Sequence, residues 1–326
     1  MAERNKVLIA RRVFPEIVES LSARFDVATN ADDTPWPPEE LARRLAGCQG
    51  VLTTIMDRVD EALLAKVPGL KVVSNIAVGV NNVDVAACTK RGIRVTNTPG
   101  VLNETTADLA WALLMACARR IAEGDAYVRR GDWKVGFEME ANLGTDVHGA
   151  TLGIIGMGRI GQAIAKRATG FDMEILYHNR SRIPEADEQR LGATRVEKDE
   201  LLARSDFVVL MVPYSPAVHH LVGAAEIAKM KPTAILVNTA RGGVVDDAAL
   251  VEALKAGRIA GAGIDVFEGE PRVNAGYLGL HNAVLTPHVG SATRATRLAM
   301  CETAAANLTA VLEGRAPPNL VNKELA

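Results

Sequence analysis

The chain has 326 residues, which suggests about two domains if roughly 150 residues is typical of each. Its composition, 48% hydrophobic and 23% charged, is ordinary for a globular protein with a large core. The formal net charge of −2 provides no general attraction for nucleic acid or an anionic membrane, so neither is expected as a partner.

Short β-rich runs alternate with helical patterns through the first hundred residues. Strands are expected at 7–10, 26–30, 50–55, 71–77 and 94–99. Amphipathic segments such as PEIVESLSARF and PPEELARRLAG lie between them, the second with prolines just ahead of the helix. This alternation predicts a parallel sheet with crossover helices.

A long helical stretch from Asn103 separates this series from a second one. It reads NETTADLAWALLMACARRIAEGDAYVRRG, with Asn103 as N-cap and Thr106 in the first turn, and it is too long and apolar for a linker. Six more strands are expected at 151–156, 174–177, 206–212, 234–239, 260–267 and 283–287. The second domain is then complete, so a last helix, from about 293 to 312, is expected to pack back on the first domain.

Cysteine spacing and hydropathy narrow the class of protein further. Cys48, Cys88, Cys117 and Cys301 lie far apart without a C-x-x-C pair, which indicates reduced thiols rather than disulfides or a zinc site, and no metal is expected. The start of the chain has only four consecutive apolar residues, too few for a signal peptide. Because no uncharged apolar run reaches the ~18 residues of a membrane span, we expect a cytoplasmic protein.

A glycine-rich turn follows the strand TLGIIG. Gly156, Gly158 and Gly161 form a G-x-G-x-x-G pattern that leads into the helix RIGQAIAKRATG, which is the setting a dinucleotide site requires. The N-terminus of that helix would offer N–H groups and partial positive charge to phosphates. The alternative is a tight turn with no ligand.

The segment YHNRSR ends the next strand, where an NAD site usually carries an acidic residue for the ribose. Asn179, Arg180 and Ser181 stand there instead. Loss of the acid removes repulsion of a 2′-phosphate, and a guanidinium can bind that phosphate with two hydrogen bonds. We therefore predict a preference for NADP(H), with NAD(H) weaker. The alternative is that the arginines are solvated surface charges.

Three separated residues follow successive strands of the second domain. Arg241, Glu270 and His288 would lie outside the carboxyl ends of these strands, where ligands bind in open α/β sheets. Such a trio can reduce a 2-oxoacid: the arginine binds the carboxylate, the imidazolium donates a proton, and the acid orients the imidazole. Taken singly, each has another reading, as a surface arginine, a strand-end acid, and a capping or core histidine.

Five motifs give the chain a family resemblance over nearly its whole length. They are NETTAD, GMGRIG, NTARGGVVDDAAL, GAGIDVFEGEP and TPHVGSAT. In this order and spacing they resemble the D-isomer-specific 2-hydroxyacid dehydrogenase family. Taken with residues 71–110, KVVSNIAVGVNNVDVAACTKRGIRVTNTPGVLNETTADLA, the sequence most resembles the bacterial glyoxylate/hydroxypyruvate reductases that also reduce 2-ketogluconate. The resemblance implies an α/β fold with a Rossmann domain at 103–290 and a discontinuous flavodoxin-like substrate domain, 1–102 and 291–326.

The resemblance also assigns roles to residues. It implies that Arg241, Glu270 and His288 are catalytic, that Val78 and Gly79 offer backbone N–H groups to the substrate carboxylate, and that Asp265 lies near the nicotinamide carboxamide. It further implies that these positions line the cofactor: Thr106, Arg159, Ile160, Pro213, Thr239, Ala240 and Gly290.

Together these observations predict an NADPH-dependent reductase of glyoxylate, hydroxypyruvate or 2-keto-D-gluconate that gives D-2-hydroxy acids. The resemblance implies a homodimer, built around the long helix at 104–130. One alternative is an NAD-dependent enzyme of the same family acting on D-lactate or 3-phosphoglycerate. Another is a dinucleotide-sensing interaction protein similar to the transcriptional corepressors that share the fold.

Overall fold

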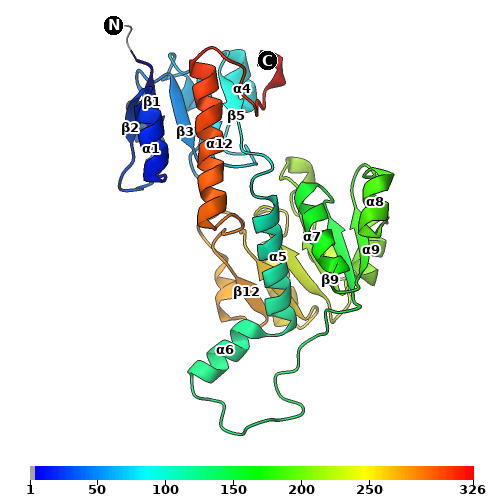
Figure 1. The fold of residues 1–326 in the computed structure, drawn as a ribbon. Helices are drawn as coiled ribbons and strands as arrows, with labels where there is room; N and C mark the ends of the chain where they lie inside the picture. Colours follow the sequence, from blue (N-terminus) through cyan, green and yellow to red (C-terminus); the bar gives the residue numbers. More distant parts are fainter. Residues whose placement is uncertain (1–3) are drawn as a thin grey trace. The chain divides into compact units, whose positions relative to one another are not determined.

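Two parallel β-sheets organise the chain, one in each of two units (Figure 1). The computed structural model describes residues 4–326. The first unit comprises the described residues of Met1–Leu102 together with Ala292–Ala326, and the second comprises Asn103–Ser291. The expected α/β class is confirmed, because each sheet is covered by helices on both faces.

The first unit contains a five-stranded sheet in the order β2-β1-β3-β4-β5. The strands are β1 (Lys6–Ile9), β2 (Asp26–Thr29), β3 (Gly50–Thr53), β4 (Val72–Asn75) and β5 (Arg94–Thr96). All neighbouring pairs are parallel. Each of the five expected runs overlaps one of these strands.

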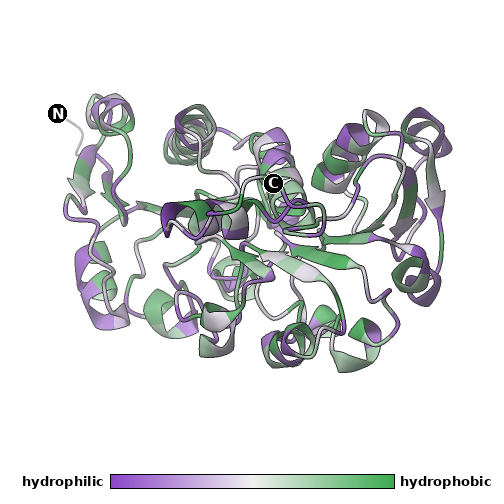
Figure 2. Cartoon of the chain, turned by 90° about the horizontal axis from the view of Figure 1, so that it is seen from below, coloured by the Kyte–Doolittle hydropathy of each residue, from purple (hydrophilic) through white to green (hydrophobic). Residues whose placement is uncertain are grey.

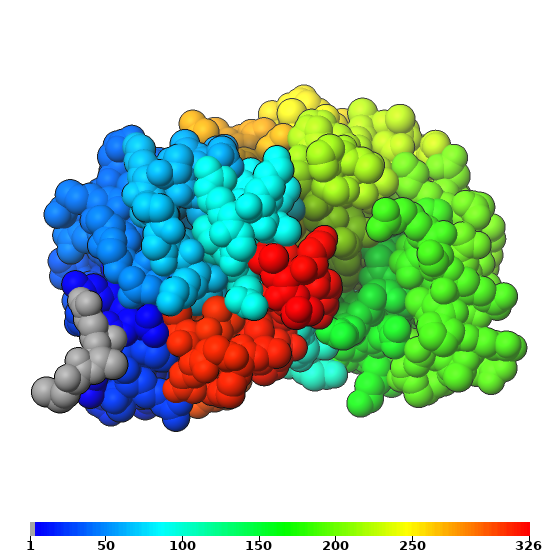
Figure 3. Space-filling view, turned by 90° about the horizontal axis from the view of Figure 1, so that it is seen from above, coloured from blue at the N-terminus to red at the C-terminus, as the bar shows by residue number. Residues whose placement is uncertain are grey.

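Successive strand residues in this unit face opposite helix layers. Val7 and Ile9 pack with α1 (Pro15–Ser22) and α12 (Arg294–Leu312), whereas Leu8 packs with α2 (Pro38–Leu45), α3 (Glu61–Leu64) and α4 (Val85–Lys90). The period of two is that of a strand buried on both faces. Ser74 Oγ donates a hydrogen bond to the carbonyl of Ala304, which joins α12 to β4. In Figure 3 the red C-terminal residues accordingly lie against the blue and cyan ones.

The second unit contains a seven-stranded parallel sheet in the order β12-β11-β10-β9-β6-β7-β8. The strands are β6 (Thr151–Ile155), β7 (Glu174–His178), β8 (Ala193–Arg195), β9 (Phe207–Leu210), β10 (Ile235–Asn238), β11 (Gly261–Ile264) and β12 (Ala283–Leu285). The expectation of six strands was wrong. β8 is a three-residue edge strand in which only Ala193 is buried, so it lacks the apolar run that reveals the others.

Two helix layers cover this second sheet. One contains α5 (Asn103–Ala118), α7 (Arg159–Thr169) and α8 (Glu185–Leu191). The other contains α9 (Lys198–Arg204), α10 (Ala224–Ile227) and α11 (Asp247–Lys255). In Figure 2 the inner strands are largely green, while purple residues mark the outer helix faces. The described part of the chain also contains three short 3₁₀ helices, at Pro216–Val218, Ala275–Gly279 and Lys323–Leu325.

The expected long helix at 104–130 is two helices. α5 ends at Ala118, and α6 (Ile121–Arg129) follows a break at Arg120, whose φ of 50° is left-handed. Thr145 N donates to the carbonyl of Ala118, so the returning chain caps the end of α5. α5 is packed into the core, whereas every residue of α6 is at least partly exposed, and in Figure 1 α6 and the segment after it extend from the sheet. Among residues 4–326, no helix has the length and apolarity that crossing a membrane requires.

Candidate functional site

The glycine-rich turn lies where the strand order of the second sheet reverses. β6 pairs with β7 on one side and β9 on the other, so the loop after β6 opens at the switch point of the sheet. Gly156 has φ 107°, and a Cβ there would lie 2.6 Å from the carbonyl carbon of Met211. A Cβ at Gly161 would lie 2.3 Å from the carbonyl oxygen of Gly156. Both positions therefore require glycine for the fold itself.

Gly158 differs from the other two glycines. A Cβ at this position would have no atom of the described residues within 4 Å, and its φ is not left-handed. Gly158 is the N-cap of α7, and no side chain caps the helix there. Arg159 and Ile160 form the first turn, in which N–H groups lack helical partners and carry the positive end of the helix dipole. The space and the N–H donors suit the pyrophosphate of a dinucleotide.

The end of β7 is tied to this loop by two hydrogen bonds. Gly156 N donates to the carbonyl of His178, and Met157 N donates to Asn179 Oδ1 at 2.7 Å. Asn179 therefore positions the glycine-rich loop. Arg180 and Ser181, which follow it, are both exposed.

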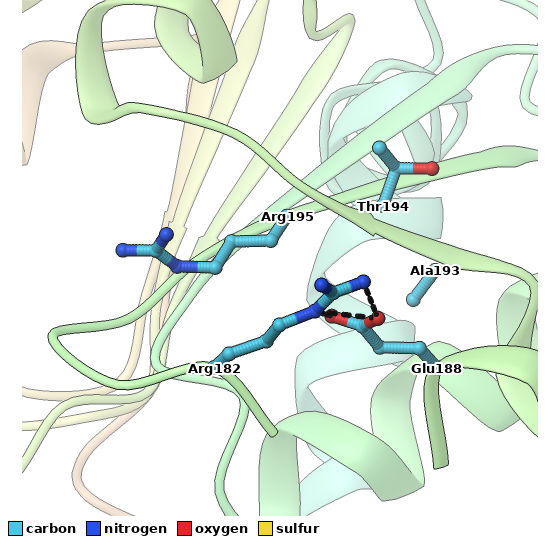
Figure 4. Close-up of a pocket in the computed structure, with 5 residues that line it drawn as sticks. All are labelled: Arg182, Glu188, Ala193, Thr194 and Arg195. Carbon is cyan, nitrogen blue, oxygen red and sulfur yellow. Dashed lines mark hydrogen bonds and ion pairs between the residues drawn. The ribbon is translucent and has the colours of Figure 1, made fainter. Parts of the chain in front are cut away.

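Next to this strand end is an open cavity of about 280 Å³ that carries three charged side chains (Figure 4). Arg182 donates to both carboxylate oxygens of Glu188, with Nη2 2.6 Å from Oε2, and the Tyr177 hydroxyl donates to the same carboxylate. The Arg182 guanidinium, followed by the Tyr177 hydroxyl, holds the pKa of Glu188 below its ordinary value. Arg182 is therefore committed to a protein partner.

Arg195 is a residue that the sequence analysis did not single out. It lies on the edge strand β8, lines the same cavity, and its Nη2 donates to the carbonyl of Asn179 at 3.3 Å. Arg195 and Asn179 are sixteen residues apart, so no local sequence pattern predicts their contact. The short strand around Arg195 also lacks the apolar run that would have identified it.

Arg180 and Arg195 thus supply positive charge at the end of β7, where the residue that faces the adenosine ribose is expected.

His288 and Glu270, which are eighteen residues apart, are hydrogen-bonded. His288 Nδ1 lies 2.7 Å from Glu270 Oε2, and Phe267 N donates to Glu270 Oε1 at 2.8 Å. Burial acts to raise the pKa of Glu270, but the hydrogen bond and charge of His288, the Phe267 N–H and the charge of Arg241 outweigh it, so the pKa is lowered. Glu270 is thus held as a carboxylate against the imidazole.

The histidine loop is held by Asp265. Asp265 Oδ1 accepts hydrogen bonds from Thr286 Oγ1 at 2.6 Å and Val289 N at 2.8 Å, and Oδ2 accepts one from Gly290 N at 3.0 Å. His288 itself has φ 51°, and its N–H donates to the carbonyl of Asp265. Burial raises the pKa of Asp265 even though these donors oppose it. Asp265 therefore positions a strained histidine backbone.

Arg241 follows β10 and is half-buried. Its Nη1 donates to the carbonyl of Ala240 at 2.6 Å, and burial lowers its pKa while the charge of Glu270 opposes that shift. Of its neighbours in the chain, Thr239 and Ala240 are buried, with Thr239 Oγ1 3.1 Å from Met211 Sδ.

Two further expected cofactor positions, Thr106 and Gly290, approach one another: a Cβ at Gly290 would lie 3.4 Å from Thr106 Cγ2. The remaining expected cofactor position, Pro213, follows β9 and is exposed.

In the first unit, two asparagines fix the peptide groups at Val78 and Gly79. Thr98 N donates to the carbonyl of Ala77, and Asn97 Nδ2 donates to the carbonyl of Val78 at 2.8 Å. In a trans peptide the N–H points opposite to the C=O, so the N–H groups of Val78 and Gly79 both point away from residues 97–98. Asn75 Nδ2 donates to the carbonyl of Gly79 at 2.9 Å, which also holds the peptide group that follows Gly79.

Comparisons with known proteins identify the family of the chain. The family model for the D-isomer specific 2-hydroxyacid dehydrogenase NAD binding domain matches residues 111–290. The glyoxylate reductase of Thermococcus litoralis is 48% identical over 323 residues, which cover 98% of this chain and 97% of that protein. The chain belongs to the D-isomer specific 2-hydroxyacid dehydrogenase family. It is an oxidoreductase with a nicotinamide cofactor, as the sequence motifs predict.

Two more relatives extend the likeness. The glyoxylate reductase of Pyrococcus horikoshii is 48% identical over 324 residues, covering 98% of this chain and 96% of that one. The crystal structure of an NADPH-dependent glyoxylate/hydroxypyruvate reductase from Sinorhizobium meliloti, in complex with NADP and malonate, has a TM-score of 0.88 at 33% identity. The match covers 98% of this chain and 97% of the S. meliloti chain. The fold and family expected from the five motifs are thereby confirmed.

Proposed function

We propose that this dehydrogenase reduces glyoxylate, and with it hydroxypyruvate and 2-keto-D-gluconate, to D-2-hydroxy acids with NADPH. The observation that carries the proposal is the 2.7 Å contact between His288 and Glu270, with the charge of Arg241 acting on the same carboxylate. An imidazole paired with a carboxylate is a proton donor that the carboxylate orients and keeps charged. The names of the Thermococcus and Pyrococcus relatives support glyoxylate as substrate.

Each proposed catalytic residue has one task. The Arg241 guanidinium binds the substrate carboxylate and polarises the carbonyl of the 2-oxoacid. His288 Nε2 gives its proton to the carbonyl oxygen, while Glu270 at Nδ1 fixes the ring and stabilises its positive charge. The N–H groups of Val78 and Gly79 also bind the substrate carboxylate. The nicotinamide, when bound, supplies a hydride to the carbonyl carbon.

The cofactor is held by the glycine-rich loop and the end of β7. The pyrophosphate would bind beside Gly158 and the N-terminus of α7. The other positions that the family resemblance assigns to the cofactor would line the rest of the dinucleotide, with Asp265 near the carboxamide of the nicotinamide. Arg180 supplies the charge that favours a 2′-phosphate, helped by Arg195 from β8. Arg182 contributes less because Glu188 already neutralises it. The S. meliloti structure, which contains NADP, supports this preference.

Steady-state kinetics with purified enzyme tests the proposal directly. NADPH and NADH are each offered with glyoxylate, hydroxypyruvate, 2-keto-D-gluconate, pyruvate and 3-phosphohydroxypyruvate. We expect the highest kcat/KM with NADPH and glyoxylate or hydroxypyruvate. A preference for NADH with pyruvate or 3-phosphohydroxypyruvate would favour the alternative dehydrogenases. Tight NADPH binding without turnover of any 2-oxoacid would favour a dinucleotide-sensing protein.

His288→Ala separates chemistry from binding. We expect turnover to fall by a factor of about 10²–10⁴, the usual contribution of a general acid, while the Kd for NADPH stays nearly unchanged. Equal losses in both would make His288 a structural residue.

We also propose a homodimer, with α6 and the segment after it as the contact. Within residues 4–326, seven of the nine large exposed hydrophobic side chains fall between 121 and 143: Ile121, Val128, Trp133, Val135, Phe137, Met139 and Leu143. Such a concentration is typical of an interaction surface. Light scattering should give twice the monomer mass of 34.7 kDa. Replacing Phe137 and Met139 together by serine should lower the measured mass. Leu278→Ser, which changes an exposed apolar residue outside this segment, should leave the measured mass unchanged.

A further inference from the structure

Two adjacent histidines and a glutamate from a distant loop converge in the second unit. His220 Nε2 lies 3.2 Å from Glu268 Oε1 and 3.3 Å from Oε2, and His219 Nε2 lies 4.0 Å from Glu268 Oε1. One ligand atom from each residue can be chosen so that all three lie within 4.8 Å of one another. The histidines follow β9 and the glutamate follows β11, two residues before the proposed catalytic Glu270.

The backbone at His220 brings both rings to one side. In an extended chain, successive side chains point in opposite directions. His220 has φ 51°, however, and the two rings stack with centroids 3.9 Å apart and planes 24° from parallel. Its N–H donates to the carbonyl of Gly243 at 2.8 Å, which anchors this turn. A left-handed residue with a Cβ is uncommon and clusters at ligand sites.

The other nitrogen of each ring faces a polar group. His219 Nδ1 lies 3.2 Å from the Tyr214 hydroxyl, and His220 Nδ1 lies 3.8 Å from Asp246 Oδ2. The Nδ1 atoms therefore face Tyr214 and Asp246, and the Nε2 atoms are the ring nitrogens on the Glu268 side. Metal-binding histidines commonly have a polar group near the ring nitrogen that does not bind the metal.

We propose that His219, His220 and Glu268 bind a divalent transition-metal ion of the zinc class. Two imidazoles and one carboxylate match the ligand preference of Zn²⁺, and they leave one tetrahedral position for water. Two ligands on such an ion, with bonds of about 2.1 Å, lie about 3.4 Å apart. The histidine–Glu268 distances of 3.2 and 4.0 Å lie on either side of that value. Binding of one ion by both rings would require the stacked imidazoles to rotate away from their near-parallel arrangement.

Charge also favours an ion at this cluster. Glu268 and Asp246 together match the two positive charges of the ion, and His219 and Glu268 are open to solvent, which provides an entry path. Without an ion, the cluster is a set of exposed histidine–carboxylate pairs, which contribute little to stability. The bound ion would join the loops after β9 and β11 and stabilise the unit by mass action. This proposal does not depend on the enzyme's substrate.

The test uses the full-length enzyme, freed of metal by a chelator and titrated with ZnCl₂ in a calorimeter. We expect saturable binding of one Zn²⁺ per chain and a higher Tm, with no effect of Mg²⁺, which prefers oxygen ligands. His220→Asn, which tolerates a left-handed backbone, and Glu268→Gln should each weaken binding by about tenfold or more. Co²⁺ should give the visible spectrum of a tetrahedral site.

Two matched variants locate the ion. His148→Asn removes another exposed histidine that pairs with one carboxylate, Asp172 at 3.0 Å, and it should leave binding unchanged. His288→Asn removes the proposed proton donor and should also leave it unchanged. Absence of saturable Zn²⁺ binding would overturn the proposal. So would binding that survives His220→Asn and Glu268→Gln but is lost in His288→Asn.

Discussion

The backbone of Gly242 lies directly against the carbonyl group of Phe267. A Cβ at Gly242 would lie 1.8 Å from the Phe267 carbonyl oxygen and 2.9 Å from Glu268 N. Gly242 follows Arg241, and the N–H of Phe267 holds Glu270. The loops that carry two of the three proposed catalytic residues are therefore packed backbone against backbone, which fixes their spacing without side chains.

Gly242→Ala should consequently damage both stability and catalysis. The methyl group cannot fit unless one loop moves, and overpacking of this kind costs about 1–3 kcal/mol. We expect a lower Tm and a loss of kcat larger than the increase in KM for NADPH. Gly279→Ala is the control, because a Cβ there would meet no atom of the described residues within 4 Å. Wild-type kinetics in Gly242→Ala would contradict the idea that this contact sets the spacing.

Gly158→Ala should affect cofactor binding without affecting the fold. The added methyl would occupy space that residues 4–326 leave empty and that we assign to the pyrophosphate. The KM for NADPH should rise about tenfold or more, a cost of the order of 1.4 kcal/mol, with little change in Tm. Gly161→Ala should instead lower Tm, since its Cβ would lie 2.3 Å from the Gly156 carbonyl oxygen. An unchanged KM in Gly158→Ala would place the pyrophosphate elsewhere.

Much of this architecture is predictable from sequence because buried parallel strands consist of consecutive apolar residues. Eleven expected strands, five in the first unit and six in the second, overlap observed ones. The twelfth, β8, was missed because Thr194 and Arg195 are exposed, so its pairing with β7 has no hydrophobic signal. The break at Arg120 was missed because Ile121 to Arg129 continues a helical pattern that only tertiary contacts interrupt.

The functional site was likewise predictable from the sequence only in part. Motifs with fixed spacing pointed to Arg241, Glu270 and His288, and the structure joins the last two by a hydrogen bond. Contacts between distant segments carry no local pattern, which is why Arg195 beside Asn179 and Glu268 beside His220 emerge only from the fold.

Arg180→Ala should change cofactor preference more than Arg182→Ala. Arg180 is exposed at the end of β7, whereas Arg182 is held by Glu188 with Nη2 2.6 Å from Oε2. We expect Arg180→Ala to lower kcat/KM for NADPH by about 10–100-fold, because one charge-assisted pair with phosphate contributes about 1.5–3 kcal/mol, and to leave NADH nearly unchanged. Arg182→Ala should mainly lower Tm. Equal effects of both variants on the NADPH/NADH ratio would contradict separate roles.

The Glu270 carboxylate should give the enzyme a defined pH dependence of stability. Its pKa is lowered in the folded protein, so its stabilisation is fully present above the unfolded pKa of about 4.3 and is lost as pH falls through the folded value. The difference in Tm between wild type and Glu270→Gln should therefore stay nearly constant from about pH 6 to 5 and shrink as the pH is lowered further, below about 4.3. Differential scanning fluorimetry over this range measures it. A difference that grows on acidification would reverse the sign we assign.

Glu270→Gln should also slow 2-oxoacid reduction. The amide can still accept the hydrogen bond at 2.7 Å from His288 Nδ1, but it no longer carries the negative charge that stabilises the imidazolium. We expect kcat at pH 7 to drop by about 10–100-fold, with little change in the Kd for NADPH. Glu268→Gln, assayed in a chelating buffer, removes a neighbouring exposed charge and should keep the wild-type kcat. If both variants lost the same factor in kcat, the paired carboxylate would not be what supports proton donation by His288.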